Sequence, residues 1–359
     1  MGSLDSNTVL HDERLSLAGI QSPFVTVIVT NYNYEKYIVS CLRSVARQSY
    51  PHFKCIIVDD CSQDNSVSLI GDFMGSPEAS ARFSLVRHEQ NGGQMAAFKT
   101  GLRHAEGVFV VFVDADDLLF EDFLDAHVGA HLGHRPVAFT SSDQYQINEH
   151  DQVLAGTHPD LSARGRYRRI KQQPIHDPFW VWATTSSMMF RKAVLDVIMP
   201  DDCDPFRVCA DNYVCHFANL IGGSLLIPEV LGCYRRHGQN YFSSNPFVGG
   251  RLPTGNMERH PKHHTVRLSI LMHILRKKET FSSLLSEGNL FMSLMRLTGP
   301  YEIIRLRRTW PEHFKDRKPG FIAKFLIASL VLQVRLRFQR YRRFYRYVLH
   351  ESKRRNPDV

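Results

Sequence analysis

Short hydrophobic runs alternate with amphipathic stretches over the first 120 residues. Four runs rich in β-branched and aromatic residues have the length of buried strands: 24–29, 55–58, 83–86 and 109–113. Between them, apolar side chains recur at the i, i+4 spacing of helices that begin near Tyr37, Ser66 and Gln94. The sequence therefore predicts an α/β fold, with a mostly parallel sheet flanked by helices.

Polar residues follow three of the predicted strands. They are Thr30-Asn31-Tyr32-Asn33, Asp59-Asp60-Cys61-Ser62 and Asp114-Ala115-Asp116-Asp117. Open α/β sheets bind ligands at the carboxyl ends of their strands. Carboxylates there suit Mg²⁺ or Mn²⁺, which share their coordination with substrate phosphates. A solvated acidic loop that starts the next helix is the alternative, because carboxylates also suit helix N-termini.

Two common nucleotide-binding motifs are missing. No G-x-G-x-x-G follows the first strand, which disfavours a dehydrogenase, and no G-x-x-x-x-G-K-[ST] occurs, which excludes a P-loop hydrolase. A nucleotidyltransferase is disfavoured because no Gly-rich basic loop follows the first strand. A catalytically inactive binding or scaffolding subunit is a further alternative, although it would not need this set of acids.

Four segments, in this order and spacing, resemble the family 2 glycosyltransferases: 25–33, 56–64, 91–94 and 112–117. These are inverting enzymes of the GT-A fold that use nucleotide-diphosphate sugars. Fainter similarity at 184–192, 209–213 and 227–240 extends the resemblance over roughly residues 23–241. It implies a metal-dependent enzyme that transfers a sugar, most simply from a UDP-sugar, to the hydroxyl of a polysaccharide, lipid-linked or other glycan acceptor.

The resemblance also implies a donor site. Its expected nucleotide-sugar ligands are Thr30, Asn31, Tyr32, Asp59, Asp60, Gln94 and Asp114. Asp59 and Asp60 would hydrogen-bond the nucleoside, and Asp116 would hold the metal with help from Asp114 and His237. Asp117 is expected only to cap the following helix.

The basic loop around His237 has competing interpretations. Arg235, Arg236 and His237 lie in a segment similar to the family's Y-R-x-H loop, and their charge would stabilise the leaving diphosphate. The alternatives are arginines on a solvated surface and a purely structural histidine.

Asp211 is the expected general base. The family often has Glu-Asp followed by an aromatic residue here, whereas this chain has Ala210, Asp211, Asn212 and Tyr213. Inverting transfer is a single displacement that needs a base on the acceptor side. The alternative is that Asp211 is the N-cap of a helix over 213–220. Trp180 and Trp182 would line an acceptor pocket, although core packing is expected for at least one of them.

Five segments are expected along the chain. They are a disordered lead at 1–22, a nucleotide-sugar half at 23–120, an acceptor half at 121–241, a linker or flap at 242–262, and a helical basic region at 263–359. A basic cluster at 164–171 is interpreted as a solvated loop, with contact to an anionic acceptor as the alternative.

Charge and cysteine content bear on location. The chain of 359 residues has a net charge of +8, and residues 301–359 hold 16 Lys or Arg against 5 Asp or Glu. The apolar stretch 321–332 is shorter than the about 20 residues needed to span a bilayer, and aromatic residues and arginines follow it. This pattern favours a helix lying on an anionic membrane over a docked helix with a solvated basic face, and no nucleic acid is expected.

Seven cysteines without a C-x-x-C, and no apolar signal segment, favour reduced thiols in a reducing compartment. Together these features predict a cytoplasmic enzyme, peripheral on the inner face of the membrane.

Overall fold

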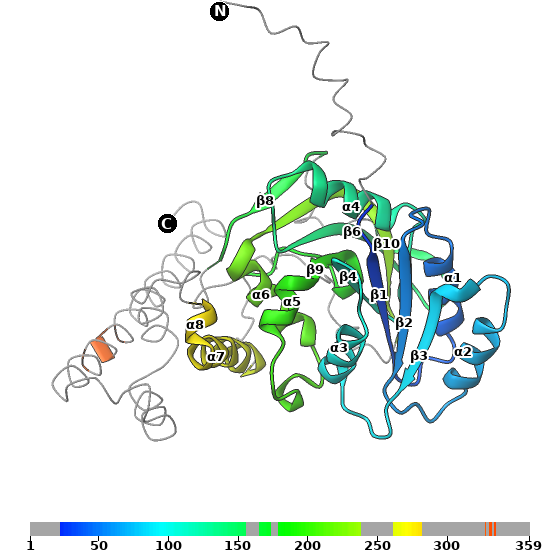
Figure 1. Ribbon diagram of the computed structural model, residues 1–359, viewed down its shortest axis with the longest axis horizontal. Coiled ribbons are helices and arrows are strands. Elements are labelled where there is room, and N and C mark those ends of the chain that lie inside the picture. Colours follow the sequence, from blue (N-terminus) through cyan, green and yellow to red (C-terminus); the bar gives the residue numbers. More distant parts are fainter. Residues whose placement is uncertain are drawn as a thin grey trace, which may run out of the picture. The chain divides into compact units, whose positions relative to one another are not determined.

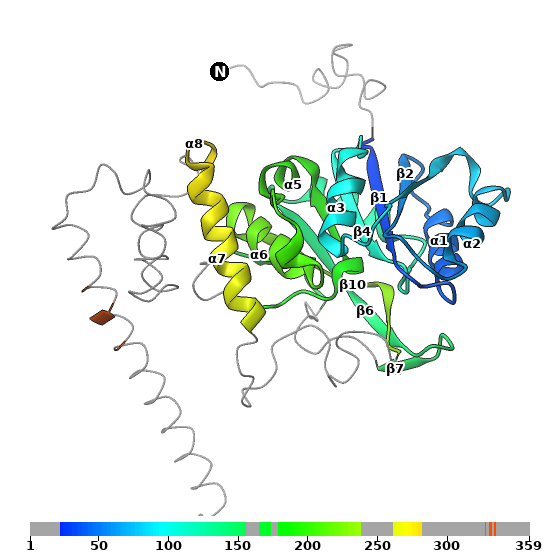
Figure 2. The same ribbon diagram turned by 90° about the horizontal axis from the view of Figure 1, so that it is seen from below.

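The computed structural model describes residues 22–155, 165–173, 179–237 and 261–281, together with residues 327, 330, 331 and 334 (Figures 1 and 2). The chain divides into two compact units. The first contains 1–170, 180–210 and 222–251, and the second contains 171–179, 211–221 and 252–359. The expected linker at 242–262 lies outside the described residues, apart from Pro261 and Lys262.

Within the described residues, the first unit contains a ten-stranded sheet in the order β3-β2-β1-β4-β9-β6-β10-β5, with β7 beside β6 and β8 beside β10. The strands are β1 (Val25–Asn31), β2 (Phe53–Asp59), β3 (Phe83–Arg87), β4 (Phe109–Asp114), β5 (Leu118–Leu119), β6 (Phe139–Ile147), β7 (Val153–Ala155), β8 (Arg168–Ile170), β9 (Met188–Arg191) and β10 (Ser224–Arg235).

The four strands expected from the sequence are parallel neighbours. β1 pairs with both β2 and β4, and β2 pairs with β3. The register places Asn31 opposite Asp59 and Thr30 opposite Asp114, so the polar ends of three strands meet at one edge. Beyond β4 the sheet is mixed, because β9 is antiparallel to β4 and β6 while β10 is parallel to β6. The predicted α/β fold is confirmed.

Helices cover both faces of this sheet (Figure 1). The helices of the first unit are α1 (Ile38–Ala46), α2 (Ser66–Met74), α3 (Gln94–Arg103), α4 (Phe123–Gly133) and α5 (Lys192–Ile198), with 3₁₀ turns η4 (Ser80–Arg82), η5 (Thr185–Ser187) and η6 (Asp204–Phe206). The main hydrophobic core joins α1, α2 and α4 to the odd-numbered side chains of β1, β2 and β4. Alternate residues of a strand point to opposite faces, so the even-numbered side chains face α3.

Helix α3 packs very close to β1. A Cβ atom added at Gly101 would lie 2.3 Å from Cγ2 of Ile28, so only glycine allows this approach. The ring of Phe98, also on α3, stacks on Phe112 of β4 with centroids 4.0 Å apart. This packing sets the position of the amino end of α3 at the polar edge of the sheet.

The described part of the second unit is helical. It contains most of α6 (Ala210–Gly222), with α7 (Pro261–Arg276) and α8 (Lys278–Phe281). The rings of Phe217 and Phe281 stack with centroids 5.5 Å apart, and His273 lies edge-on to both. Within the described residues, no helix has the length and apolar character needed to cross a membrane. The basic segment that follows residue 334 lies outside the described residues.

Candidate active site

The acidic turn after β4 is built around a buried carboxylate. Asp117 is fully buried, and its Oδ1 accepts the backbone N–H of Arg235 (2.9 Å) while its Oδ2 accepts the hydroxyl of Ser186 (2.7 Å). The expectation that Asp117 caps the following helix is wrong, because α4 begins at Phe123 and has Asp122 at its N-cap position. Asp117 instead ties the turn to β10 and η5.

Asp116 faces a histidine from the far end of the unit's sequence. Its Oδ2 lies 2.9 Å from Nε2 of His237, and both side chains are buried. The His237 ring stacks on Tyr37, with centroids 5.0 Å apart, and Tyr34 meets it edge-on. Two groups that the sequence assigned to a metal are therefore adjacent in the structure.

Arg235 is not a solvated surface residue, so that alternative is wrong for this position. Its side chain is 1% exposed and lies over the Tyr37 ring, 4.8 Å from the centroid. Nε donates to the backbone oxygen of Asp116 (2.8 Å), and Nη1 donates to the backbone oxygen of Asn148 (3.1 Å) and pairs with Asp151. The guanidinium thus fastens the acidic turn to the connection between β6 and β7. Arg236 is partly exposed, and its Nη1 donates to Gln146 (3.3 Å).

The three acids of the turn create a strongly negative environment. Burial raises the pKa of the Asp117 carboxyl well above its ordinary value, and the charges of Asp116 and Asp114 raise it further. The same three carboxylates add to burial in raising the pKa of the Tyr34 hydroxyl. Like charges held this close in a poorly solvated site favour a bound cation.

The donor set fits a divalent ion that is shared with a substrate. Among the described residues, no group of three or more His, Cys, Asp or Glu side chains could hold a metal by protein ligands alone. Mg²⁺ commonly takes only one or two carboxylates and completes its coordination with water and substrate phosphates. Asp116, paired with His237, offers a carboxylate for such a shared site, and the part expected of Asp114 stays a prediction.

The ends of β1 and β2 are bound to each other and to Asp114. Oδ1 of Asp114 accepts the side-chain amide of Gln94 (3.1 Å) and lies 3.5 Å from the Thr30 hydroxyl. Oδ1 of Asp59 accepts the side-chain amide of Asn31 (2.7 Å). Tyr32, the remaining residue expected at the donor site, is 44% exposed. The expected donor residues therefore lie at one edge of the sheet, and their contacts with a nucleotide stay a prediction.

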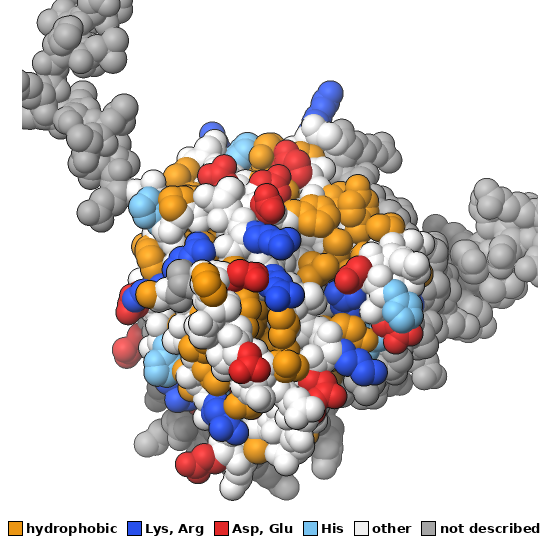
Figure 3. Space-filling view, turned by 90° about the vertical axis from the view of Figure 1, so that its right-hand side faces the viewer, with side chains coloured by type: hydrophobic (Ala, Val, Ile, Leu, Met, Phe, Trp, Pro, Cys, Tyr) orange, Lys and Arg blue, Asp and Glu red, His pale blue; other side chains and the backbone are white. Residues whose placement is uncertain are grey.

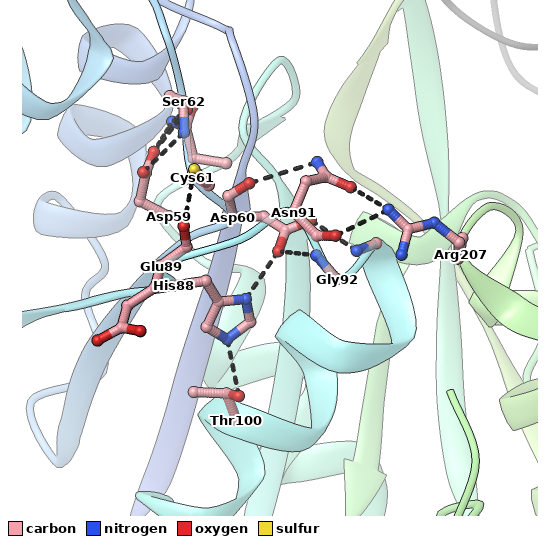
Figure 4. Close-up of polar contacts among 12 residues, drawn as sticks. Asp59, Asp60, Cys61, Ser62, His88, Glu89, Asn91, Gly92, Thr100 and Arg207 are labelled. Atoms are coloured by element: carbon pink, nitrogen blue, oxygen red, sulfur yellow. Dashed lines mark hydrogen bonds and ion pairs between the residues drawn. The ribbon is translucent and has the colours of Figure 1, made fainter. Parts of the chain in front are cut away.

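Asp60 has a dense set of partners within the protein (Figure 4). Its Oδ1 accepts the backbone N–H of Gly92 (2.8 Å) and lies 2.7 Å from Nδ1 of His88. Its Oδ2 accepts the backbone N–H of Gly93 (2.7 Å). The sequence did not single out His88, because no local motif marks a histidine whose partner lies 28 residues away.

The tryptophans of the acceptor half differ in position. Trp182 is fully buried, with its ring against Phe139 and its Nε1 donating to the Ser224 hydroxyl (2.8 Å). Trp180 is half-buried and meets Trp182 edge-on, with centroids 5.4 Å apart. The expectation that at least one of them packs in the core is confirmed.

Asp211 belongs to the second unit. Helix α6 begins at Ala210, so Asp211 lies in the first turn, and the expectation of an N-cap before a helix at 213–220 is wrong. Its Oδ1 accepts the backbone N–H of Asn212 (2.8 Å). Burial raises the pKa of the Asp211 carboxyl to about 6, which brings its proton affinity closer to the range useful for general base catalysis.

A groove of about 330 Å³ opens at the amino end of β1 and β2, where Thr26, Lys54 and Glu106 contribute to its lining. Lys54 lies near the start of β2, whereas Asp59 ends that strand, so the groove is separate from the acids. The face near β3 and α2 shows acidic, basic and hydrophobic side chains mixed together (Figure 3). The carboxyl edge of the sheet therefore remains the candidate active site.

The sheet order, the flanking helices and the acids at the strand ends define a GT-A type α/β protein. Residues 26–198, just under half of the chain, match the model described as glycosyl transferase family 2. The crystal structure of TarS 1-349 from S. aureus in complex with UDP-GlcNAc aligns with a TM-score of 0.54 at 19% identity, covering 86% of this chain and 79% of that one. This likeness shows the fold. The expected family and fold are confirmed, and the family is one of transferases.

Relatives match over shorter stretches. An uncharacterized glycosyltransferase of Nostoc sp. is 27% identical over 222 residues, which are 60% of this chain and 66% of that protein. The poly(ribitol-phosphate) beta-N-acetylglucosaminyltransferase TarS of Staphylococcus aureus is 35% identical over 112 residues, which are 28% of this chain and 19% of TarS. The chain thus spans less than two thirds of the length of these curated relatives.

Proposed function

We propose that this protein is a metal-dependent inverting glycosyltransferase that moves a sugar from a nucleotide-diphosphate sugar to an acceptor hydroxyl. The observation that carries the proposal is the pair of Asp116 and His237, 2.9 Å apart and buried beside Asp114 and Asp117. A scaffolding protein would have no reason to maintain such a concentration of charge. The match of residues 26–198 to the family 2 model supports the same conclusion.

The donor would lie along the carboxyl edge of β1, β2 and β4. Asn31 and Asp59 are adjacent at the first two strand ends and would contact the nucleoside, with Thr30, Tyr32 and Asp60 nearby in the chain. Asp114 would share the ribose and the metal. TarS 1-349 was crystallised in complex with UDP-GlcNAc, which supports a UDP-sugar as the first donor to test.

The leaving diphosphate needs positive charge. Asp116, Asp114 and His237 would hold a divalent cation, Mg²⁺ or Mn²⁺, which when bound neutralises charge on the phosphates. Arg235 keeps the backbone of the acidic turn in place through its bond to the oxygen of Asp116. Arg236, which is partly exposed, would contribute charge toward the diphosphate.

Asp211 would remove the proton from the acceptor hydroxyl. With a pKa of about 6 its carboxyl is still ionised at neutral pH, yet it accepts a proton more readily than an ordinary aspartate. Direct attack by the activated hydroxyl on the anomeric carbon inverts the configuration and releases the nucleoside diphosphate.

The acceptor proposed is a glycan, either free or lipid-linked. TarS is named for transfer to poly(ribitol-phosphate), which supports a polyol-phosphate polymer as one class to test. Peripheral binding to an anionic membrane at the cytoplasmic face is part of the proposal, and it rests on the basic C-terminal sequence alone.

A donor screen tests the proposal. The purified full chain is incubated with UDP-, GDP- and dTDP-sugars, with Mg²⁺, Mn²⁺ or EDTA, and the release of nucleoside diphosphate is measured with and without glycan acceptors. We expect one nucleotide class to be released in a metal-dependent manner. Failure with every donor would argue for a non-catalytic GT-A subunit.

Asp211→Asn tests the assignment of the base. The amide keeps the shape of the side chain but cannot take a proton, so transfer should fall by about 10³-fold while nucleotide binding stays within about twofold. Equal loss of nucleotide binding and transfer would indicate that Asp211 has a structural role instead. Asp196→Asn, at a half-exposed position paired with Lys192, is the matched control.

A further inference from the structure

The first residue of α3 makes three hydrogen bonds that run in two directions. The backbone N–H of Gln94 donates to the backbone oxygen of Arg207 (2.9 Å), and its side-chain Oε1 accepts the N–H of Ala210 (2.9 Å). Its Nε2 donates to Oδ1 of Asp114 (3.1 Å). One amide side chain therefore spans the distance between an acid of the candidate site and the segment that leads into α6.

Gly93, just before Gln94, packs closely against Arg207 in the segment that leads into α6. Gly93 has a φ of +83°, and a Cβ atom added there would lie 2.5 Å from Cα of Arg207. The guanidinium of Arg207 reaches in the other direction and donates to the backbone oxygen of Asn91 (2.8 Å) and to its side-chain oxygen. Glycine is required at position 93 for both reasons, conformation and space.

A partly buried pair, Asp60 and His88, anchors this loop (Figure 4). The two oxygens of Asp60 accept the N–H groups of Gly92 and Gly93, and Oδ1 also receives Nδ1 of His88. A carboxylate only accepts, so Nδ1 of His88 carries the hydrogen. Nε2 of His88 is 2.9 Å from the hydroxyl of Thr100, which lies further along α3. The loop and the helix are thus fastened to the end of β2.

We propose that Gln94 is a positioning residue that couples the Asp114 carboxylate to the segment 207–210, while the Asp60–His88 pair holds the loop that presents it. The inference rests on the proposed function, and it changes the role expected for Gln94 from a donor ligand to a residue that acts through another. Asp60 likewise changes from a nucleoside ligand to the anchor of the loop.

The chemical identity of residue 94 is what matters in this arrangement. Asp114 needs an N–H donor at 3.1 Å to keep its carboxylate in one orientation beside Asp116, and Ala210 needs an acceptor. Only a side-chain amide supplies both groups from one position. A carboxylate at position 94 would still accept from Ala210 but would repel Asp114.

Two variants distinguish the contact of Gln94 with Asp114 from its contact with Ala210. Gln94→Glu keeps the acceptor for Ala210 and loses the donor to Asp114, whereas Gln94→Met has a similar length and loses both. Lys99→Met is the control, because Lys99 on the same helix donates to the backbone oxygens of Pro200 and Asp201 instead. Hydrogen exchange is measured by mass spectrometry on peptides that contain Ala210. Turnover, and binding of UDP, GDP and dTDP with Mn²⁺, are measured in parallel.

We expect exchange at Ala210 to rise about tenfold in Gln94→Met and to stay within about threefold of the parent in Gln94→Glu. Turnover should fall at least about tenfold in both variants, because both disturb Asp114. Lys99→Met should change neither quantity by more than about threefold. Parent-like turnover in Gln94→Glu, or parent-like exchange in Gln94→Met, would overturn the inference. If the parent protein binds no nucleotide and turns over no donor, the proposed function fails, and the exchange measurement still decides whether Gln94 holds Ala210.

A double-mutant cycle tests the part assigned to His88. His88→Leu should lower turnover about fivefold in the parent chain and have little further effect in the Gln94→Met background, because both changes act through the same contact. Additive losses would show that His88 supports folding without acting through Gln94. His88→Gln, which keeps a hydrogen-bond donor, should recover part of the activity and serves as the reference if His88→Leu folds poorly.

Discussion

The acids at the end of β2 and those that follow β4 look alike in the sequence but differ in their surroundings. Both oxygens of Asp59 and both oxygens of Asp60 accept hydrogen bonds from the protein, mostly from neighbouring N–H groups. In the turn after β4, burial and the charges of Asp116 and Asp114 instead raise the pKa of Asp117, although both of its oxygens accept hydrogen bonds, and all three carboxylates add to burial in raising the pKa of Tyr34. The first group is stabilised by the fold, whereas the second is costly for the fold to keep.

This difference distinguishes carboxylates that support the fold from carboxylates that are available to bind a cation. A buried carboxylate that accepts several N–H bonds organises a loop, and its charge is compensated before any ligand arrives. Carboxylates crowded together in a buried turn have charge left to share with a cation. Acidic residues at a strand end are therefore informative about function only once their hydrogen-bond donors are known.

The largest expected effect comes from the second group. Asp116→Asn removes the charge next to His237 with almost no change in shape, so turnover should fall by about 10³-fold, together with metal-dependent nucleotide binding. The midpoint of urea unfolding should change little, because repulsion with Asp114 and Asp117 is relieved. Steady-state kinetics and calorimetric titration of nucleotide with Mn²⁺ measure these outcomes.

Asp72→Asn on the exposed side of α2 is the matched control for this change. Full activity in Asp116→Asn would mean that the metal is held elsewhere. A large loss of stability with only a small loss of turnover would make Asp116 resemble Asp60, and the contrast between the two strand ends would disappear.

Asp60→Asn should have the opposite profile. An asparagine must turn its NH₂ toward the N–H of Gly92 or of Gly93, so one buried donor is left facing another donor. We expect the free energy of unfolding to fall by about 3 kcal/mol, measured by urea denaturation, with loss of activity following from the disturbed loop. Nucleotide affinity that drops while stability is kept would instead restore Asp60 to the donor site.

Much of the first half of the fold could be predicted from the sequence because it depends on local patterns. The strands, the starts of three helices and the meeting of polar strand ends all follow from periodicity and from parallel pairing. The roles of Asp117 and Arg235 could not be predicted in this way. Both depend on contacts between β10 and the acidic turn, which are far apart in the chain, and no local motif reveals a partner at that distance.

The candidate site shows the same limit. The four conspicuous motifs contained Asp60 and Gln94, but nothing in the local pattern connects either residue with His88 or Arg207. Residue type alone suggested ligands, since acids and amides at strand ends usually bind something. The structure shows that some of these polar side chains hold loops in place.

Acid pH should weaken the fold through a third group of residues, remote from both sets of acids. Burial lowers the pKa of His131 to about 4 and that of His127 well below its ordinary value, so both are neutral in the native protein. Histidines in the unfolded chain bind protons below about pH 6.5, and this lowers the free energy of the unfolded state. The free energy of unfolding therefore falls as the pH drops from about 6.5 toward the native pKa. His131 alone should contribute a loss of about 2 kcal/mol between about pH 7 and pH 5.

Urea denaturation across this pH range measures the slope. His131→Gln, which removes the titrating ring, should flatten it even if the variant is less stable at neutral pH. An unchanged slope would mean that the loss of stability in acid comes from the carboxylates and not from His131.

The smallest expected effect tests whether Asp59 and Asp60, at the end of β2, have different roles. Ser62 donates its hydroxyl to Oδ1 of Asp59 (2.6 Å) and its backbone N–H to Oδ2 (3.0 Å). Ser62→Ala removes the first of these bonds, together with those that the hydroxyl oxygen accepts from the Asn31 amide (3.0 Å) and from the N–H of Asn33 (2.9 Å). We expect a loss of about 2 kcal/mol in stability, against about 1 kcal/mol for Ser76→Ala, whose hydroxyl makes a single local bond to the oxygen of Phe73. If Asp59 also contacts the nucleoside, only Ser62→Ala should weaken nucleotide binding, by about three- to fivefold, because the loosened carboxylate must be reoriented on binding. Equal nucleotide affinity in the two variants would mean that Asp59, like Asp60, serves the loop rather than the ligand.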